Sequence, residues 1–77
     1  MVISLVDMKA GERGIVVDIE GGCGARDRIQ NLGVRIGKAI TKTGAYFGRG
    51  PQTVIVDNFK AAIGHGMAAK IFIEVER

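Results

Sequence analysis

The sequence predicts a mainly β domain, a small, partly open barrel of about five short strands with one short inserted helix. Three observations support this fold class. Apolar and polar residues alternate in several short runs, twelve glycines interrupt those runs, and one short stretch has the spacing of an amphipathic helix. With 77 residues, of which 47% are hydrophobic, the chain can build one core, so residues 1–77 are expected to form a single domain.

The helix is predicted from about Ala25 to Leu32, around which the rest of the chain is organised. Ala25, Ile29 and Leu32 are spaced by four and three residues, which places them on one face of a helix. Gly33 follows directly and can adopt the left-handed conformation that ends a helix. Gly37 is a second permissive position before the chain resumes as a strand.

Alternation at the start of the chain predicts a first strand from Gly14, after a single helical turn that Ser4 is placed to cap. Side chains two residues apart share a face of a strand. The predicted faces of this strand are Ile15, Val17 and Ile19 on one side and Val16, Asp18 and Glu20 on the other.

The second half of the chain predicts the remaining strands and one short helical turn. Asp57 and Asn58 form a plausible tight turn, because both residues tolerate positive φ. Gly64 and Gly66 argue against a long helix here. The predicted strands are Lys38–Thr43, Gln52–Asp57, Phe59–Ile63 and Ile71–Val75, with a glycine-rich loop over Gly44–Pro51 and a helical turn over His65–Ala69.

The positive charge of the chain is concentrated in the middle of the sequence, which limits the kinds of partner to be expected. Six lysines and arginines lie between positions 26 and 49 against one acidic residue there, Asp27, in a chain of net charge +3. Such a basic middle could meet nucleic acid, an anionic membrane surface or an acidic protein. The apolar runs are too short to cross a bilayer, and no signal-type leader is visible, so a cytoplasmic protein is expected.

The motifs of several enzyme classes are missing from the sequence. Gly37-Lys38-Ala39 lacks the hydroxyl residue of a phosphate-binding loop, and no glycine run completes the dinucleotide fingerprint. One cysteine, Cys23, and one histidine, His65, offer no metal-ligand spacing. We therefore expect no catalytic activity and no bound cofactor, with Cys23 and His65 as ordinary loop residues.

The candidate partner-binding residues are Tyr46, Phe47 and Arg49. The two aromatics are adjacent in the predicted loop between Gly44 and Gly48, and exposed loop aromatics often anchor a partner protein. The alternative is that both rings fold back and cap the end of the barrel. Arg49 could extend the contact to an acidic group, and Cys23 with its glycine loop is a second, weaker candidate.

The order and spacing of residues along the chain resemble the FeoA family, the small cytoplasmic component of bacterial ferrous iron uptake. The most specific segments are Arg28–Gly37 and Ala62–Ala68. In one departure, Ile36 stands where the family often has proline. The resemblance rests on Leu5, Met8, Gly11, Glu12, Gly14, Val16, Ile19, Gly21, Gly22, Arg28, Ile29, Leu32, Gly33, Val34, Gly37, Ile40, Gly50, Pro51, Val54, Val56, Ala62, Ile63, Gly64, Met67, Ala68, Ile71 and Ile73.

The resemblance implies an SH3-like barrel with an inserted helix and a role beside FeoB, a membrane permease with a cytoplasmic GTPase domain. On that basis we expect a non-catalytic accessory protein of ferrous iron uptake that docks on FeoB and is peripheral to the membrane through it. The alternatives are a nucleic-acid-binding barrel that uses the basic 26–49 stretch, which we do not favour, or a general protein-interaction module. Direct binding of a transition metal ion and self-association stay open.

Overall fold

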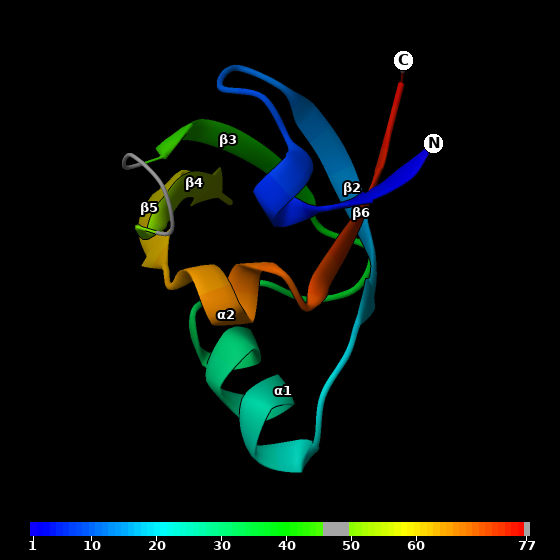
Figure 1. Ribbon diagram of the computed structural model, residues 1–77, viewed down its shortest axis with the longest axis vertical. Helices are drawn as coiled ribbons and strands as arrows, with labels where there is room; N and C mark the ends of the chain where they lie inside the picture. The colour runs from blue at the N-terminus through cyan, green and yellow to red at the C-terminus, as the bar shows by residue number, and fades with distance from the viewer. Residues whose placement is uncertain (46–49, 77) are drawn as a thin grey trace.

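The computed structural model describes residues 1–45 and 50–76 and shows a curved six-stranded sheet with two α-helices and one 3₁₀ turn (Figure 1). The prediction of a mainly β, partly open barrel is confirmed, with one strand more than expected, at Val2–Ser4. The elements in chain order are β1 (Val2–Ser4), η1 (Leu5–Asp7), β2 (Arg13–Ile19), α1 (Cys23–Asn31), β3 (Ala39–Ala45), β4 (Gln52–Val56), β5 (Phe59–Ile63), α2 (His65–Ala68) and β6 (Ile71–Val75).

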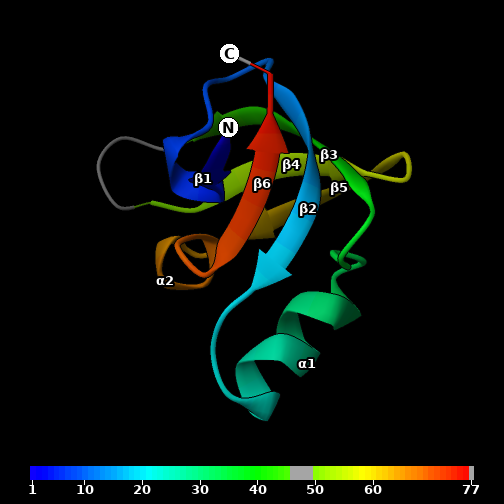
Figure 2. The same cartoon turned by 90° about the vertical axis from the view of Figure 1, so that its right-hand side faces the viewer.

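The strands lie in the order β1-β6-β2-β3-β4-β5, and each neighbouring pair is antiparallel. The barrel is open because β1 and β5 each have one neighbour and are the two edges of the sheet. Figure 2 shows β6 and β2 side by side on the near face, with α1 beyond one end of the barrel. The inserted helix therefore extends from the barrel instead of lying inside it.

The core is filled by apolar side chains from all six strands and from the segments that join them. Alternate residues of β4 and β6 are buried, as expected for strands with one face on a core. The buried apolar residues are Ile3, Leu5, Met8, Val16, Ile19, Ile29, Val34, Ile40, Val54, Val56, Ile63, Ala68, Ile71, Ile73 and Val75.

The predicted faces of β2 are wrong because the strand contains an irregularity. The pairing of β2 with β6 shifts register between Val16 and Asp18. One extra residue at a bulge moves the following side chains to the other face. Val16 and Ile19 are buried as a result, whereas Ile15 and Val17 remain 43% and 40% exposed.

The helix prediction is confirmed with shifted limits, since α1 begins at Cys23 and ends at Asn31. Gly33 has a φ of +89°, and its N–H donates to the Gln30 carbonyl at 2.9 Å, which ends the helix as expected. Ile29 is fully buried, but Leu32 is 40% exposed. The end of α1 therefore presents an apolar side chain to the surface.

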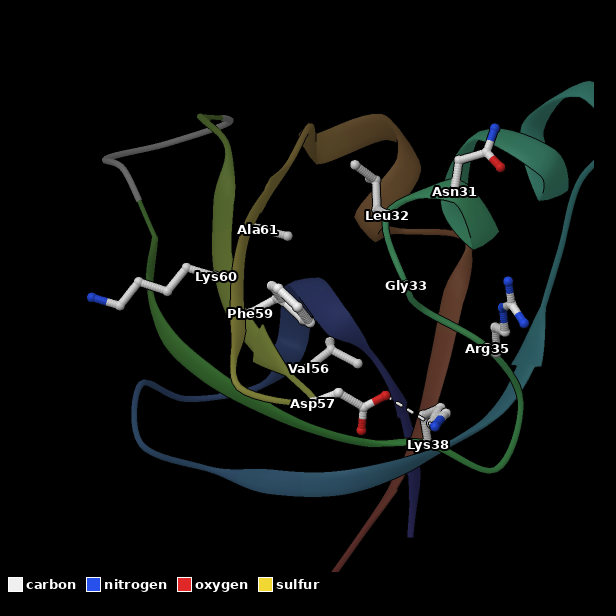
Figure 3. Close-up of a pocket in the computed structure, with 10 residues that line it drawn as sticks. All are labelled: Asn31, Leu32, Gly33, Arg35, Lys38, Val56, Asp57, Phe59, Lys60 and Ala61. Atoms are coloured by element: carbon white, nitrogen blue, oxygen red, sulfur yellow. Dashed lines mark ion pairs between the residues drawn. The ribbon is translucent and has the colours of Figure 1, made fainter.

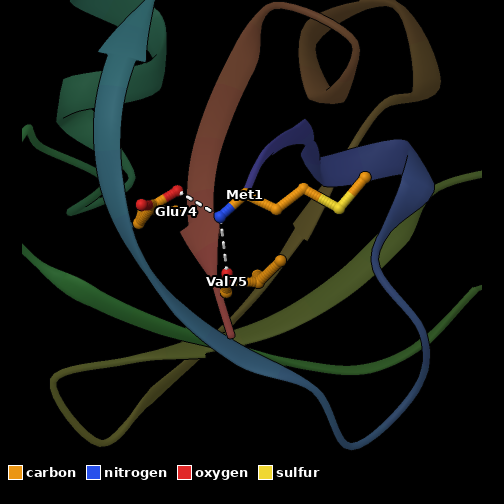
Figure 4. Close-up of polar contacts among 3 residues, drawn as sticks. All are labelled: Met1, Glu74 and Val75. Carbon is orange, nitrogen blue, oxygen red and sulfur yellow. Dashed lines mark hydrogen bonds and ion pairs between the residues drawn. The ribbon is translucent and has the colours of Figure 1, made fainter. Parts of the chain in front are cut away.

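The N-terminal segment is held against β6. The Met1 amino group donates to the Val75 carbonyl at 3.0 Å and forms a 2.9 Å ion pair with Glu74 (Figure 4). Ser4 does not cap η1 through its side chain, because its hydroxyl donates to the Asp7 carboxylate at 3.2 Å. The predicted turn is present, without the predicted cap.

Replacing Gly14 tests the packing of β2 against β6. A Cβ at this buried position would lie 2.5 Å from the Glu74 carbonyl oxygen and 2.8 Å from a Val75 methyl, so Gly14→Ala should lower the free energy of unfolding by about 1–3 kcal/mol. Gly24→Ala in α1 is the matched control, because nothing lies within 4 Å of its Cβ position and alanine favours helix by about 0.5–1 kcal/mol. Urea unfolding followed by circular dichroism gives the unfolding free energy of both variants. Equal values for Gly14→Ala and Gly24→Ala would contradict the close packing of β2 against β6.

Candidate functional site

The residues predicted to bind a partner are mostly outside the part of the chain that the structure describes. Tyr46, Phe47 and Arg49 fall in the segment 46–49, which lies outside the described residues. Cys23 is the first residue of α1, so the prediction that it lies in a loop is wrong. The role of these four residues stays a prediction.

The structure instead presents an open groove between the end of α1 and the β4–β5 hairpin (Figure 3). Its volume is about 550 Å³. One wall comes from the segment that joins α1 to β3, and the other from the end of β4 and the first half of β5. The residues lining it are Asn31, Leu32, Gly33, Arg35, Lys38, Val56, Asp57, Phe59, Lys60 and Ala61.

A two-residue turn shapes the hairpin wall of this groove. Asp57 and Asn58 have φ values of +50° and +69°, and Val56 pairs with Phe59 directly across the turn. Turns of this kind match the twist of a hairpin and favour Asn and Asp. Lys38 forms a 2.9 Å ion pair with Asp57, which links the start of β3 to the hairpin tip.

The groove carries exposed apolar side chains on both walls. Phe59 is 74% exposed and Leu32 is 40% exposed, and Figure 3 shows them on opposite sides of the groove. Apolar side chains that gather around one groove can be covered by a partner, and aromatic residues are enriched among the anchors of protein interfaces. The sequence predicts Leu32 on the apolar face of the helix and Phe59 as the first residue of a strand, with no binding role for either.

The charges beside the groove are not balanced. Lys38 is paired with Asp57, but Arg35 and Lys60 are exposed and have no ion pair within the described residues. Both are basic side chains. The groove is therefore apolar inside, with Arg35 among the residues that line it and the Lys60 side chain directed away from it on the other face of β5, and this part of the surface suits a ligand or partner that carries carboxylates.

Lys42 is the buried charged side chain among the described residues, at 4% exposure. Its Nζ donates to the carbonyls of Leu5 at 3.2 Å and Val6 at 3.1 Å. Burial lowers the pKa of Lys42 below its usual value, and the carboxylates of Asp7 and Glu12 oppose part of that shift. Because Nζ is engaged with backbone carbonyls, we assign Lys42 a structural role.

The described residues offer no cluster of side chains for a metal ion. Within residues 1–45 and 50–76 no group of three or more His, Cys, Asp and Glu side chains could hold a metal ion. In the same part of the chain, no helix has the length and apolar character needed to span a bilayer. Asp57, the carboxylate among the residues that line the groove, is ion-paired with Lys38.

Fold and groove define the class of the protein as a small, open β-barrel domain with an exposed apolar groove. The chain belongs to the FeoA domain family, whose model matches residues 3–75. It is 36% identical over 66 residues to a protein described as Fe(2+) transport protein A of Methanocaldococcus jannaschii, and the match covers 86% of this chain and 78% of that protein. The resemblance deduced from the sequence is confirmed.

Solved structures confirm the SH3-like barrel. A crystal structure of an iron uptake regulatory protein (FeoA) is 34% identical, with a TM-score of 0.88 and 96% of both chains covered. A FeoA-like protein from Clostridium acetobutylicum has a TM-score of 0.87 at 20% identity, over 99% of this chain and 88% of that one. A manganese-dependent transcriptional repressor shares the fold over 42% of its length, at 16% identity and a TM-score of 0.89.

Replacing Lys42 tests its structural role. Lys42→Met leaves the Leu5 and Val6 carbonyls without the lysine donor, which should lower the free energy of unfolding by about 1–3 kcal/mol. Because the pKa of Lys42 is lower in the folded state, the unfolded state binds more protons at any pH between the folded-state pKa and the unfolded-state pKa. Wild-type stability should therefore rise with pH across that window, up to about pH 10.4, relative to the variant.

The measurement is urea unfolding of both proteins at several pH values from 7 to about 10.5. The difference in unfolding free energy isolates Lys42, because the other titrating groups are shared. A difference that stays constant with pH would contradict the lowered pKa, and equal stability at pH 7 would contradict the structural role of the two hydrogen bonds.

Proposed function

We propose that this chain is a non-catalytic accessory protein of ferrous iron transport that acts in the cytoplasm by docking on a membrane permease of the FeoB type. Membership of the FeoA domain family is the observation that carries the proposal. The names of its relatives, an Fe(2+) transport protein A and an iron uptake regulatory protein, support the link to iron.

The groove between α1 and the β4–β5 hairpin is the docking surface that we favour. Burying a phenylalanine side chain stabilises a contact by about 1.5–3 kcal/mol, and Phe59 still has most of its surface available. Leu32 adds a second apolar contact on the facing wall. Tyr46, Phe47, Arg49 and Cys23 remain proposed contacts, as an alternative or an addition to the groove.

The test is binding of the purified chain to the purified cytoplasmic part of an FeoB-type permease by isothermal titration calorimetry. Phe59→Ser should weaken binding about tenfold or more, and Leu32→Ser should weaken it less, because smaller apolar areas are removed. Val2→Ser is the matched control, since Val2 is also exposed, at 56%, but lies on β1 at the opposite edge of the sheet.

The double variant Tyr46→Ala, Phe47→Ala separates the two candidate surfaces. Loss of binding in this variant with unchanged binding of Phe59→Ser would move the docking surface to the 46–49 loop. Absence of binding by the wild-type chain would refute docking on the permease.

A further inference from the structure

We propose, as a refinement that rests on the docking role above, that the partner supplies an extended segment that adds to β5 as a seventh strand. The structure assigns this segment a chemistry, namely acidic and apolar residues in alternation. Both parts of the proposal come from the geometry of β5 and of the groove beside it.

The free edge of β5 carries hydrogen-bonding groups that face outward. β5 has β4 as its one neighbour in the sheet. Val56 and Phe59 close a two-residue turn and therefore form the hydrogen-bonded pair nearest to it, and the pairs of Ala61 and Ile63 repeat this pattern. It follows that the N–H and C=O groups of Lys60 and Ala62 point away from β4.

These outward groups have no backbone partner in the described part of the chain. Neither Lys60 nor Ala62 takes part in a backbone hydrogen bond outside the β4–β5 ladder within residues 1–45 and 50–76. An edge strand with unpaired groups is a template for another strand, which is the basis of peptide recognition by strand addition. The groove adjoins this strand, since Phe59, Lys60 and Ala61 line it.

The two faces of β5 determine which side chains the incoming segment carries. Phe59 and Ala61 share a face with the buried Ile63, and Figure 3 shows Phe59 and Ala61 directed to the groove while Lys60 points away from it. In an added strand, side chains on the groove face would meet Phe59 and Ala61, with Leu32 across the groove. Side chains on the other face would lie beside Lys60, whose charge has no partner in the described residues.

Lys60 also argues against a second copy of this chain as the occupant. If two β5 strands paired antiparallel about Ala61, each Lys60 would lie opposite an Ala62 and both ammonium groups would share one face. β5 carries no carboxylate to offset them. A lysine in the middle of an edge strand disfavours self-pairing and favours an acidic segment.

The experiment is a titration of the ¹⁵N-labelled chain with the capped peptide Ser-Leu-Glu-Val-Glu-Leu-Ser, followed by NMR. Peptide binding should shift the amide signals of Lys60 and Ala62 and slow their hydrogen exchange, because these are the groups that would enter the new ladder. Two peptides serve as controls: one with both glutamates changed to lysine, and one with both glutamate amides N-methylated, which keeps the side chains but blocks the backbone hydrogen bonds.

Variants of the protein separate charge from backbone pairing. Lys60→Glu should weaken binding of the acidic peptide about five- to tenfold and improve binding of the lysine peptide, as expected for one exposed charge pair reversed. Ala62→Pro removes the outward N–H of residue 62, and edge strands tolerate proline. In this variant the peptide should no longer protect the Lys60 amide from hydrogen exchange. Ala62→Val keeps the N–H and is its matched control.

Equal binding of the N-methylated peptide would overturn strand addition, and so would stronger binding of a proline-rich peptide of the same length. If the chain without peptide has a dimeric mass and the amides of Lys60 and Ala62 are already protected from hydrogen exchange, a second copy occupies this edge. That result would also overturn the proposal. If the peptide does not bind but the permease fragment does, strand addition fails and the docking role stands. If the peptide binds but the permease fragment does not, the docking role fails and the assignment of the β5 edge is supported.

Discussion

The sheet of this protein curves without closing, and the architecture depends on how its open side is held. The buried side chain of Lys42 on β3 donates to the Leu5 and Val6 carbonyls of η1. Because β6 and β2 separate β1 from β3 in the sheet, these two bonds join parts of the chain that the ladder leaves apart. Burial of the ammonium group lowers its pKa, and the cost of that burial is offset by the hydrogen bonds to these two carbonyls.

Much of the fold could be predicted because several of its strands alternate buried and exposed residues. β4 and β6 bury every second residue, and the glycine after α1 has the positive φ that its position requires. The faces of β2 could not be predicted, since the register shift after Val16 depends on how β6 pairs with it. β1 was missed because three residues are too few to show a period.

The candidate site was harder to predict, because it joins two segments that are far apart in the sequence. Leu32 fits the apolar face of α1, and Phe59 fits the start of a strand, so each had an ordinary structural explanation. Only the fold shows that both side chains remain exposed and face one groove. The adjacent aromatics Tyr46 and Phe47 were noticeable in sequence because their loop is local, and their role is still a prediction.

One local feature, the turn at Asp57 and Asn58, accounts for both properties of the binding surface. The two-residue turn fixes which residues of β5 bond to β4, and so leaves the backbone of Lys60 directed outward. The same register puts Phe59 next to the turn, at the end of the hairpin, where the core no longer covers it. Since one short turn sets both the unpaired edge and the exposed ring, an extended segment that pairs with this edge would cover Phe59 in the same step.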